Sequence, residues 1–324
     1  MRLGKLAVAA ILVAVAAAGC GQPAGGSQQQ FTGLRIMVPN TPGGGYDTTA
    51  RTAGKAMEGA KLARNVEVFN LPGAGGTVGL QRVVNEKGNG KLLMQMGLGV
   101  VGSVYTNKSK ATLGDTTPIA RLIQEPDIVV VPKNSKYQTL DQLVTAWKAN
   151  PGKVTVGGGS SPGGPDHLAP MLMAQAVGIE PKTVNYVSYD GGGELLAALL
   201  GGQLGFGVSG VSEYAAQIES GQMRVLAVTS AERVDGVDAP TLQESGIDVE
   251  FNNWRGLVAP PGLKDADREK LLTLVEELRG SAEWKVALKK NGWTDAYLAG
   301  EEYGAFIESE NKRVGEVLTS LGLA

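Results

Sequence analysis

The chain reads PGGGYD at residues 42–47 and PGAGG at residues 72–76. Each stretch follows a short apolar run and precedes a segment with helical patterning, which predicts a strand, a tight turn and a helix start. The first turn of a helix leaves backbone N–H groups free and carries partial positive charge, so it suits an oxyanion. Two such turns in successive units of a parallel sheet lie side by side. The pair therefore predicts a two-loop site for a small anion; the alternative is that both turns only connect strands to helices.

The same alternation of strand, glycine-containing loop and helix continues along the chain. Apolar runs at residues 91–96, 154–156, 183–187 and 204–208 predict further strands, and the last three run into loops rich in glycine and serine. Thr139, with a glutamine three residues later, predicts the start of another helix. Strands that alternate with helices indicate an α/β fold of mostly parallel sheets flanked by helices.

Two breaks divide this pattern, at residues 124–126 and 251–253. Strands are predicted on both sides of the first break, at residues 118–123 and 128–131, and after the second, at residues 254–258. Two passages of chain between two lobes make a hinge, with a ligand cleft where the loops face each other. The alternatives are two rigidly packed domains or one large sheet. The predicted lobes are residues 31–125 plus 254–324 (lobe 1) and residues 126–253 (lobe 2).

The first twenty residues have the pattern of a bacterial lipoprotein signal. Two basic residues precede an apolar run at residues 6–18, which is too short to span a bilayer, and small residues lead to Cys20. We predict that residues 1–19 are a signal peptide and that Cys20 carries lipid; a simple cleaved signal and an uncleaved anchor are the alternatives. Residues 20–30 are rich in Gly, Gln, Ser and Pro and predict a flexible tether. The expected location is the outer face of the cytoplasmic membrane, with a lipid anchor.

Composition argues against several classes of function. The chain has one histidine, His167, and one cysteine, so the usual base and nucleophile sets of hydrolases cannot be assembled, and soft or imidazole metal ligands are scarce. Net charge is −2 with acids and bases interspersed, without the basic stripe of a nucleic-acid-binding protein. We therefore expect a binding protein that is not an enzyme and has no metal, no cofactor and no nucleic-acid partner. An exported hydrolase that uses a carboxylate pair is the alternative.

Polar residues at the predicted strand ends have two interpretations each. Asp47 and Asp190 either favour a helix start or accept a hydrogen bond from a ligand hydroxyl or ammonium group. Arg255, beside the second break, is the cation best placed to reach an acid. Hydroxyl groups that either cap a helix or donate to a carboxylate are those of Thr48, Ser160, Ser161 and Ser209. Aromatic side chains that either wall the cleft or fill the core are Tyr46, Tyr189 and Trp254.

A consecutive series of motifs resembles a known family. PGGGYD and PGAGG are followed by a Ser-Pro-Gly loop that leads to His167-Leu168-Ala169, then by VLAVTSAER at residues 225–233, PTLQESG at 240–246 and WRGLVAPPG at 254–262. This series resembles the substrate-binding proteins of tripartite tricarboxylate transporters, the TctC or Bug family, over nearly the whole mature chain.

The resemblance implies a two-lobed periplasmic-binding-protein fold of type II that closes on a small organic carboxylate, a di- or tricarboxylate such as citrate. It also implies delivery by a monomer to a transporter with one large and one small integral membrane subunit. The second-lobe loop at residues 161–167 is longer here than in the family, and many relatives have a simple signal peptide where this chain has a lipobox. A binding protein for an amino acid or an aromatic acid, serving a sensor kinase, is the alternative.

The resemblance also assigns the ligand contacts. In the family the first two loops hold a ligand carboxylate through backbone amides and ordered waters, and loops of the second lobe complete the site. The lobe 1 residues that match are Gly43, Gly44, Gly45, Tyr46, Asp47, Thr48, Pro72, Gly73, Ala74, Gly75 and Gly76. The lobe 2 residues are Ser160, Ser161, Gly163, Gly164, His167, Tyr189, Asp190, Gly191 and Ser209.

Overall fold

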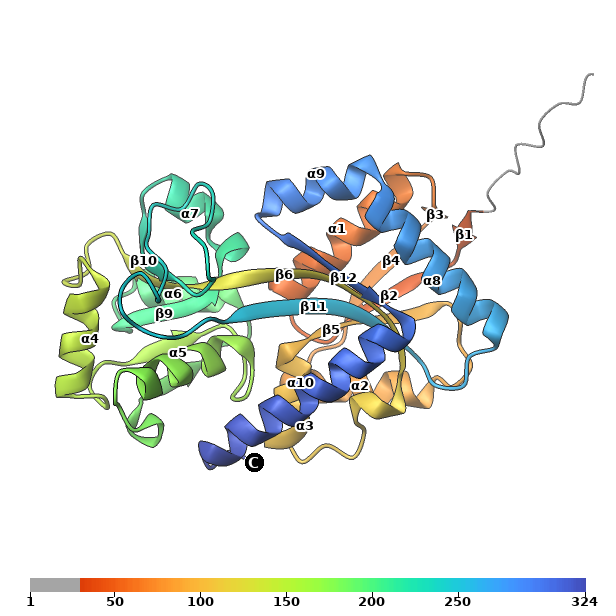
Figure 1. Ribbon diagram of the computed structural model, residues 1–324. Helices are drawn as coiled ribbons and strands as arrows, with labels where there is room; N and C mark the ends of the chain where they lie inside the picture. Colours follow the sequence, from red (N-terminus) through yellow and green to blue (C-terminus); the bar gives the residue numbers. More distant parts are fainter. Residues whose placement is uncertain (1–29) are drawn as a thin grey trace, which may run out of the picture.

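A computed structural model describes residues 30–324. The predicted signal peptide, Cys20 and all but the last residue of the predicted tether lie outside these residues. The described chain forms two lobes side by side, and two long strands, β6 (Thr117–Pro132) and β11 (Asn252–Ala259), run from one lobe to the other (Figure 1). This arrangement confirms the predicted two-lobed α/β fold.

The first lobe is built on three parallel strands, β2 (Arg35–Val38), β4 (Glu67–Asn70) and β5 (Leu92–Gly97), in the order β4-β2-β5. Their apolar side chains are buried because helices cover both faces of the sheet. These helices and the short strands at the lobe's edge are α1 (Gly45–Gly59), α2 (Thr77–Asn85), α3 (Leu98–Thr106), β1 (Phe31–Thr32) and β3 (Ala63–Arg64).

The second lobe repeats this plan with the parallel strands β7 (Val156–Gly158), β8 (Tyr186–Ser188) and β9 (Phe206–Gly210), in the order β9-β7-β8. Thr139 caps α4, since its hydroxyl accepts a hydrogen bond from the Gln142 N–H, as the sequence predicts. The remaining elements of this lobe are α4 (Leu140–Ala149), α5 (Pro165–Ala176), α6 (Gly192–Leu200), α7 (Ala215–Glu219) and β10 (Met223–Val228).

The two lobes are joined by antiparallel pairing that the sequence pattern does not predict. β11 pairs with both β5 and β6, and β6 pairs with β9 and β10. The predicted break at residues 124–126 is wrong, because β6 runs through it as one strand. Glu125 is polar yet fully buried, and its partner is the side chain of Arg255 on β11. The predicted lobe boundaries lie inside these paired strands and stay a prediction.

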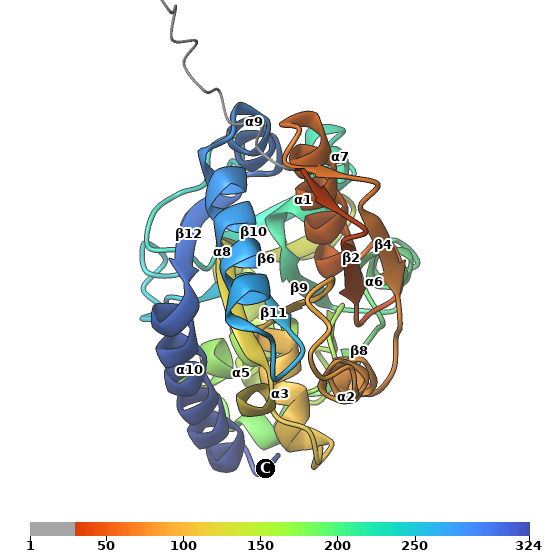
Figure 2. The same cartoon turned by 90° about the vertical axis from the view of Figure 1, so that its right-hand side faces the viewer.

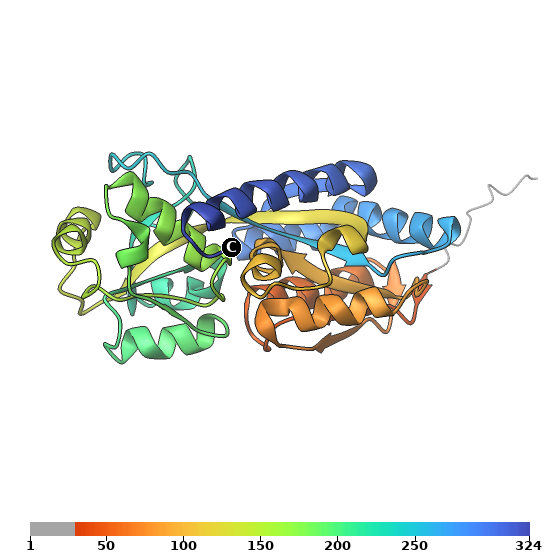
Figure 3. The same cartoon turned by 90° about the horizontal axis from the view of Figure 1, so that it is seen from below.

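The C-terminal segment packs around the first lobe and the crossing strands. It consists of α8 (Asp265–Gly280), α9 (Ala282–Asn291), β12 (Thr294–Ala299) and α10 (Gly300–Ser320). β12 pairs with β6, and α10 runs along the same side of the molecule (Figures 2 and 3). The Trp254 indole N–H donates to Glu310 on α10 at 2.8 Å, which ties this helix to β11. Within residues 30–324, no helix combines the length and the apolar character that crossing a membrane requires.

Candidate functional site

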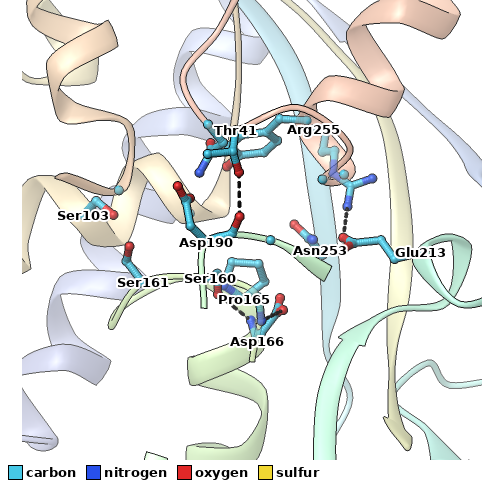
Figure 4. Close-up of a pocket in the computed structure, with 18 residues that line it drawn as sticks. Thr41, Ser103, Ser160, Ser161, Pro165, Asp166, Asp190, Glu213, Asn253 and Arg255 are labelled. Carbon is cyan, nitrogen blue, oxygen red and sulfur yellow. Dashed lines mark hydrogen bonds and ion pairs between the residues drawn. The ribbon is translucent and has the colours of Figure 1, made fainter. Parts of the chain in front are cut away.

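A cavity of about 60 Å³ lies between the two lobes, where glycine-containing loops from both converge (Figure 4). The first lobe lines it with Asn40, Thr41, Gly44, Gly45, Tyr46, Gly75, Gly99 and Ser103. The second lobe lines it with Gly159, Ser160, Ser161, Pro165, Asp166, Asp190, Gly191 and Glu213. Asn253 and Arg255 reach it from β11.

The loops that start α1 and α5 have the same conformation. Gly43 and Gly163 have φ angles of 91° and 88°, in the left-handed region that favours glycine. The residue that precedes each helix, Gly44 or Gly164, is extended, with φ and ψ of −79° and 175° in one and −80° and 174° in the other. The sequences PGGGYD and PGGPDH (162–167) are thus equivalent segments of the two lobes.

Asp47 and His167 occupy equivalent positions and hold their loops in the same way. The Gly43 N–H donates to the Asp47 carboxylate at 3.0 Å, and the Gly163 N–H donates to Nδ1 of His167 at 3.2 Å. Burial alone would raise the pKa of Asp47. Hydrogen bonds from Arg51, Gly43 and Asn70 outweigh this effect, so the pKa lies below its ordinary value. Neither side chain lines the cavity. The structural role of both side chains is to hold the loop that precedes their helix.

His167 is held in its neutral form. Its Nδ1 accepts a backbone N–H, so this nitrogen carries no proton, and its ring packs edge-on against Tyr186 at a centroid distance of 4.6 Å. Burial lowers the pKa of His167 to about 4. The unfolded chain, with an ordinary histidine pKa of 6.5, binds a proton first as the pH falls. The stability that this difference contributes is present above pH 6.5 and is lost as the pH falls through 4.

We predict that His167→Gln flattens the acid side of the stability profile. The shift corresponds to up to about 3 kcal/mol, so the wild-type protein should lose more stability than the variant between about pH 7 and about pH 4.5. Urea unfolding of both proteins measures this difference. Since the chain has one histidine, proton NMR follows its titration directly. An imidazole that titrates near its ordinary pKa in the folded protein would contradict the prediction.

The first lobe presents hydrogen-bond donors to the cavity. α1 begins at Gly45 without a side-chain cap, which leaves the N–H groups of its first turn without intrahelical acceptors. Gly75 has a φ angle of 61° and places the backbone of PGAGG beside Ser103. The Ser103 hydroxyl is 1% exposed and has no hydrogen-bond partner in the part of the chain that the structure describes. A small anion suits these groups.

Charged side chains gather where β11 and the second lobe meet the start of α1, since a Cβ atom added to Gly45 would contact both Arg255 and Glu213. Arg255 is buried and forms an ion pair with Glu125, while its Nη2 lies 3.8 Å from Glu213. Burial raises the pKa of Glu213 to about 8 and that of Asp166 to about 6. Asp127 is buried beside them without a hydrogen bond to its carboxyl oxygens, and burial raises its pKa well above the ordinary value. The carboxyl groups here outnumber the guanidinium group that faces them.

The two lobes touch across the mouth of the cavity. The Thr41 hydroxyl donates to the backbone carbonyl of Asp190 at 2.6 Å (Figure 4), and the Thr106 hydroxyl donates to that of Pro162 at 3.1 Å. A Cβ atom added to Gly102 on α3 would lie 1.8 Å from the carbonyl oxygen of Gly163. The lobes are therefore closed over the cavity in this structure.

The structure brings together only part of the predicted contact set, and a role in ligand binding stays a prediction for all of its residues. The predicted residues that line the cavity are Gly44, Gly45, Tyr46, Gly75, Ser160, Ser161, Asp190 and Gly191. Those that do not line it are Gly43, Asp47, Thr48, Pro72, Gly73, Ala74, Gly76, Gly163, Gly164, His167, Tyr189 and Ser209.

Lining residues absent from the predicted contact set are Asn40, Thr41, Gly99, Ser103, Gly159, Pro165, Asp166, Glu213, Asn253 and Arg255. Arg255 is the one that the sequence pattern singles out as a cation. Asp166 carries a usable signal as well, because it follows Pro165 at a helix start. Among the described residues, no group of three or more His, Cys, Asp and Glu side chains is arranged to hold a metal ion.

Two lobes that are joined by crossing strands and have a cavity between them, at the ends of parallel strands, are the architecture of periplasmic-type solute-binding proteins. The chain matches the Tripartite tricarboxylate transporter family receptor, TctC, over residues 49–323, and it belongs to that family. The family is one of solute-binding receptors, not of enzymes.

Individual relatives agree with this assignment. The UPF0065 protein in the gbd 5' region of Cupriavidus necator is 30% identical over 327 residues, which cover 98% of this chain and 97% of the relative. The periplasmic binding protein BugD is 24% identical with a TM-score of 0.81, over 90% of this chain and 97% of BugD. MatC from Rhodopseudomonas palustris, solved with bound malate, is 22% identical with a TM-score of 0.78, over 89% of this chain and 99% of MatC. At these identities the two structures show the shared fold.

Proposed function

We propose that this protein captures a small organic carboxylate between its lobes outside the cytoplasm and delivers it to a tripartite transporter in the membrane. The observation that carries the proposal is a set of donors on the first lobe: the first-turn N–H groups of α1, which no side chain caps, and the buried Ser103 hydroxyl, which has no partner among residues 30–324. The malate bound in MatC, which has the same fold, supports a carboxylate as the ligand. A di- or tricarboxylate such as citrate is the class that the family resemblance implies.

The partner in this proposal is a transporter with one large and one small integral membrane subunit. Cys20 would hold the protein to the outer face of the membrane by lipid, with residues 20–30 as the tether. Residues 31–125 plus 254–324 and residues 126–253 would move as two lobes, with the crossing strands as the hinge. Mass spectrometry of the protein isolated from its own membranes tests the anchor, because lipid on Cys20 adds a defined mass that Cys20→Ser removes.

A thermal-shift screen of the purified protein tests the capture of a carboxylate. A ligand at about 100 times its dissociation constant stabilises the protein by about 2.7 kcal/mol, which raises the melting temperature by several degrees. The panel contains dicarboxylates, citrate, aromatic acids and amino acids. The absence of a shift with every acid, in folded protein freed of carried-over ligand, would contradict the proposal.

Gly44→Leu should abolish the shift without unfolding the protein. Gly44 has an extended backbone that any residue adopts, and a Cβ atom there would lie 3.9 Å from the Cα of Gly191 across the cleft. The longer leucine side chain therefore fills the space between the lobes. Gly193→Leu is the matched control, because Gly193 is exposed with no atom within 4 Å of an added Cβ. An undiminished ligand-induced rise in melting temperature in Gly44→Leu would mean that the ligand binds outside this cleft.

A further inference from the structure

The equivalent loops of the two lobes differ in what they offer a ligand. At the start of α1, the N–H groups of Gly45 and Tyr46 are free of intrahelical acceptors. At the start of α5, Pro165 has no N–H group, and the N–H of Asp166 donates to the Ser160 hydroxyl at 3.1 Å. The start of α5 therefore lacks the free N–H groups that the start of α1 offers a carboxylate.

Acceptor groups take the place of these donors. Asp166 and Glu213 both line the cavity; in Figure 4 Asp166 lies below Asn253, and the Glu213 carboxyl group faces the Arg255 guanidinium group. One oxygen of Asp166 accepts from the Gly159 N–H at 2.6 Å, which orients the carboxyl group. This end of the cavity is thus rich in oxygen atoms that accept hydrogen bonds.

Asn253 gives independent evidence for a missing donor. Its side chain is 3% exposed and lines the cavity, yet its Oδ1 atom has no hydrogen-bond partner among residues 30–324. A buried amide oxygen without a donor costs about 1 to 3 kcal/mol, so such an atom normally has a partner. The cavity beside Asn253 is where a ligand N–H group would supply it.

The charge balance points in the same direction. The charged groups that act on Asp127 are Asp166, Glu125, Glu213 and a single cation, Arg255. Arg255 is already paired with Glu125. One positive charge therefore faces four carboxyl groups among the described residues, and a positive charge on the ligand would improve this balance.

We infer that the ligand holds its carboxylate against the first lobe and a protonated amino group against Asp166, Glu213 and Asn253, which makes it a small amino acid. The inference rests on the proposed capture of a carboxylate and narrows its substrate class. Citrate would instead place further carboxylates against a wall that already carries acids.

Proton exchange on binding separates the two ligand classes. The groups that face Glu213 are Asp166 on α5, Arg255 on β11, Glu125 on β6 and the adjacent Tyr214. The pKa of Glu213 is about 8 in this environment, so it is largely protonated at neutral pH. A bound ammonium group lowers this pKa, which releases a proton and makes affinity rise with pH across about pH 6 to 8. A second ligand carboxylate raises it, which reverses both signs.

Isothermal titration calorimetry of the whole mature protein tests the inference. Each amino acid is compared with the acid that lacks only its amino group: alanine with propionate, aspartate with succinate and glutamate with glutarate. Two buffers of different ionisation enthalpy report the protons exchanged. We expect at least one amino acid to bind tenfold or more tightly than its partner and to release protons. A tighter-binding partner acid, or proton uptake with the amino acid, overturns the inference while the proposed function stands. If neither the amino acids nor their partner acids bind, the result contradicts the proposed function itself.

Two variants locate the amino group. Glu213→Gln should reduce the preference for the amino acid at least tenfold and abolish proton release, while binding of the partner acid is kept or improved. Asp166→Asn should act in the same direction, because its amide oxygen still accepts the Gly159 N–H. Glu219→Gln is the matched control, since Glu219 is exposed on α7 and does not line the cavity. Circular dichroism confirms folding, and an unchanged preference in both folded site variants overturns the assignment.

Discussion

We expect Gly102→Ala to weaken ligand binding by about tenfold or more while the protein stays folded. Gly102 lies within α3, where alanine is favoured over glycine by about 1 kcal/mol, so the first lobe itself gains stability. In the closed arrangement, however, the added methyl group would lie 1.8 Å from the carbonyl oxygen of Gly163. Overpacking of this kind costs about 1 to 3 kcal/mol. Because the clash exists only when the lobes are closed, it makes closure less favourable by this amount. Calorimetric titration with the ligand found in the screen measures the loss.

Gly304→Ala is the matched control for this substitution. Gly304 lies within α10, and a Cβ atom there meets Pro118 at 3.4 Å, an ordinary contact away from the cleft. It gains the same helical propensity without touching the second lobe. Small-angle scattering should show Gly102→Ala as the more extended protein in the presence of ligand. Full affinity in folded Gly102→Ala would mean that the ligand-bound protein is less closed than this structure.

The sequence predicts the conformation of the glycine-containing loops better than it predicts which residues line the cavity. PGGGYD and PGAGG are local signals, and both form the turns and helix starts that their glycines predict. Asp47 and His167 belong to the predicted contact set because the family resemblance assigns the whole of each loop to the ligand. The structure shows that such a residue can face its own loop, as the equivalent hydrogen bonds from Gly43 and Gly163 do. The sequence match between PGGGYD and PGGPDH was the available signal for this shared role.

Residues that meet only through long-range pairing gave no local signal. Asn253 lies opposite Glu125 in the β11–β6 pair, and Glu213 reaches the same place from another part of the second lobe. The sequence pattern predicts a break at residues 124–126, but the buried Arg255 compensates the charge of Glu125 within a continuous strand. The sequence pattern does not predict α3, for a related reason. It is apolar on most sides, because it packs against α10 and the crossing strands, so it has no amphipathic pattern.

The largest change in stability is expected from Arg255→Met. Arg255 is buried with Glu125, and removal of one partner of a buried ion pair costs about 3 to 5 kcal/mol because the other charge is left uncompensated. Asp127 and Asp166, which already repel one another, add to this cost. Urea unfolding at neutral pH measures the loss. Glu125→Gln alone should cost less, because removal of the Glu125 charge lowers the pKa of Glu213, which lies 3.8 Å from the guanidinium group and can ionise in its place.

The double variant Glu125→Gln with Arg255→Met separates the ion pair from simple packing. It leaves no unpaired charge at the position of Glu125, so it should be more stable than Arg255→Met alone even though it carries one more substitution. The expected coupling between the two sites is about 1 to 3 kcal/mol. If the double variant were the less stable of the two, Arg255 would contribute through its packing on β11.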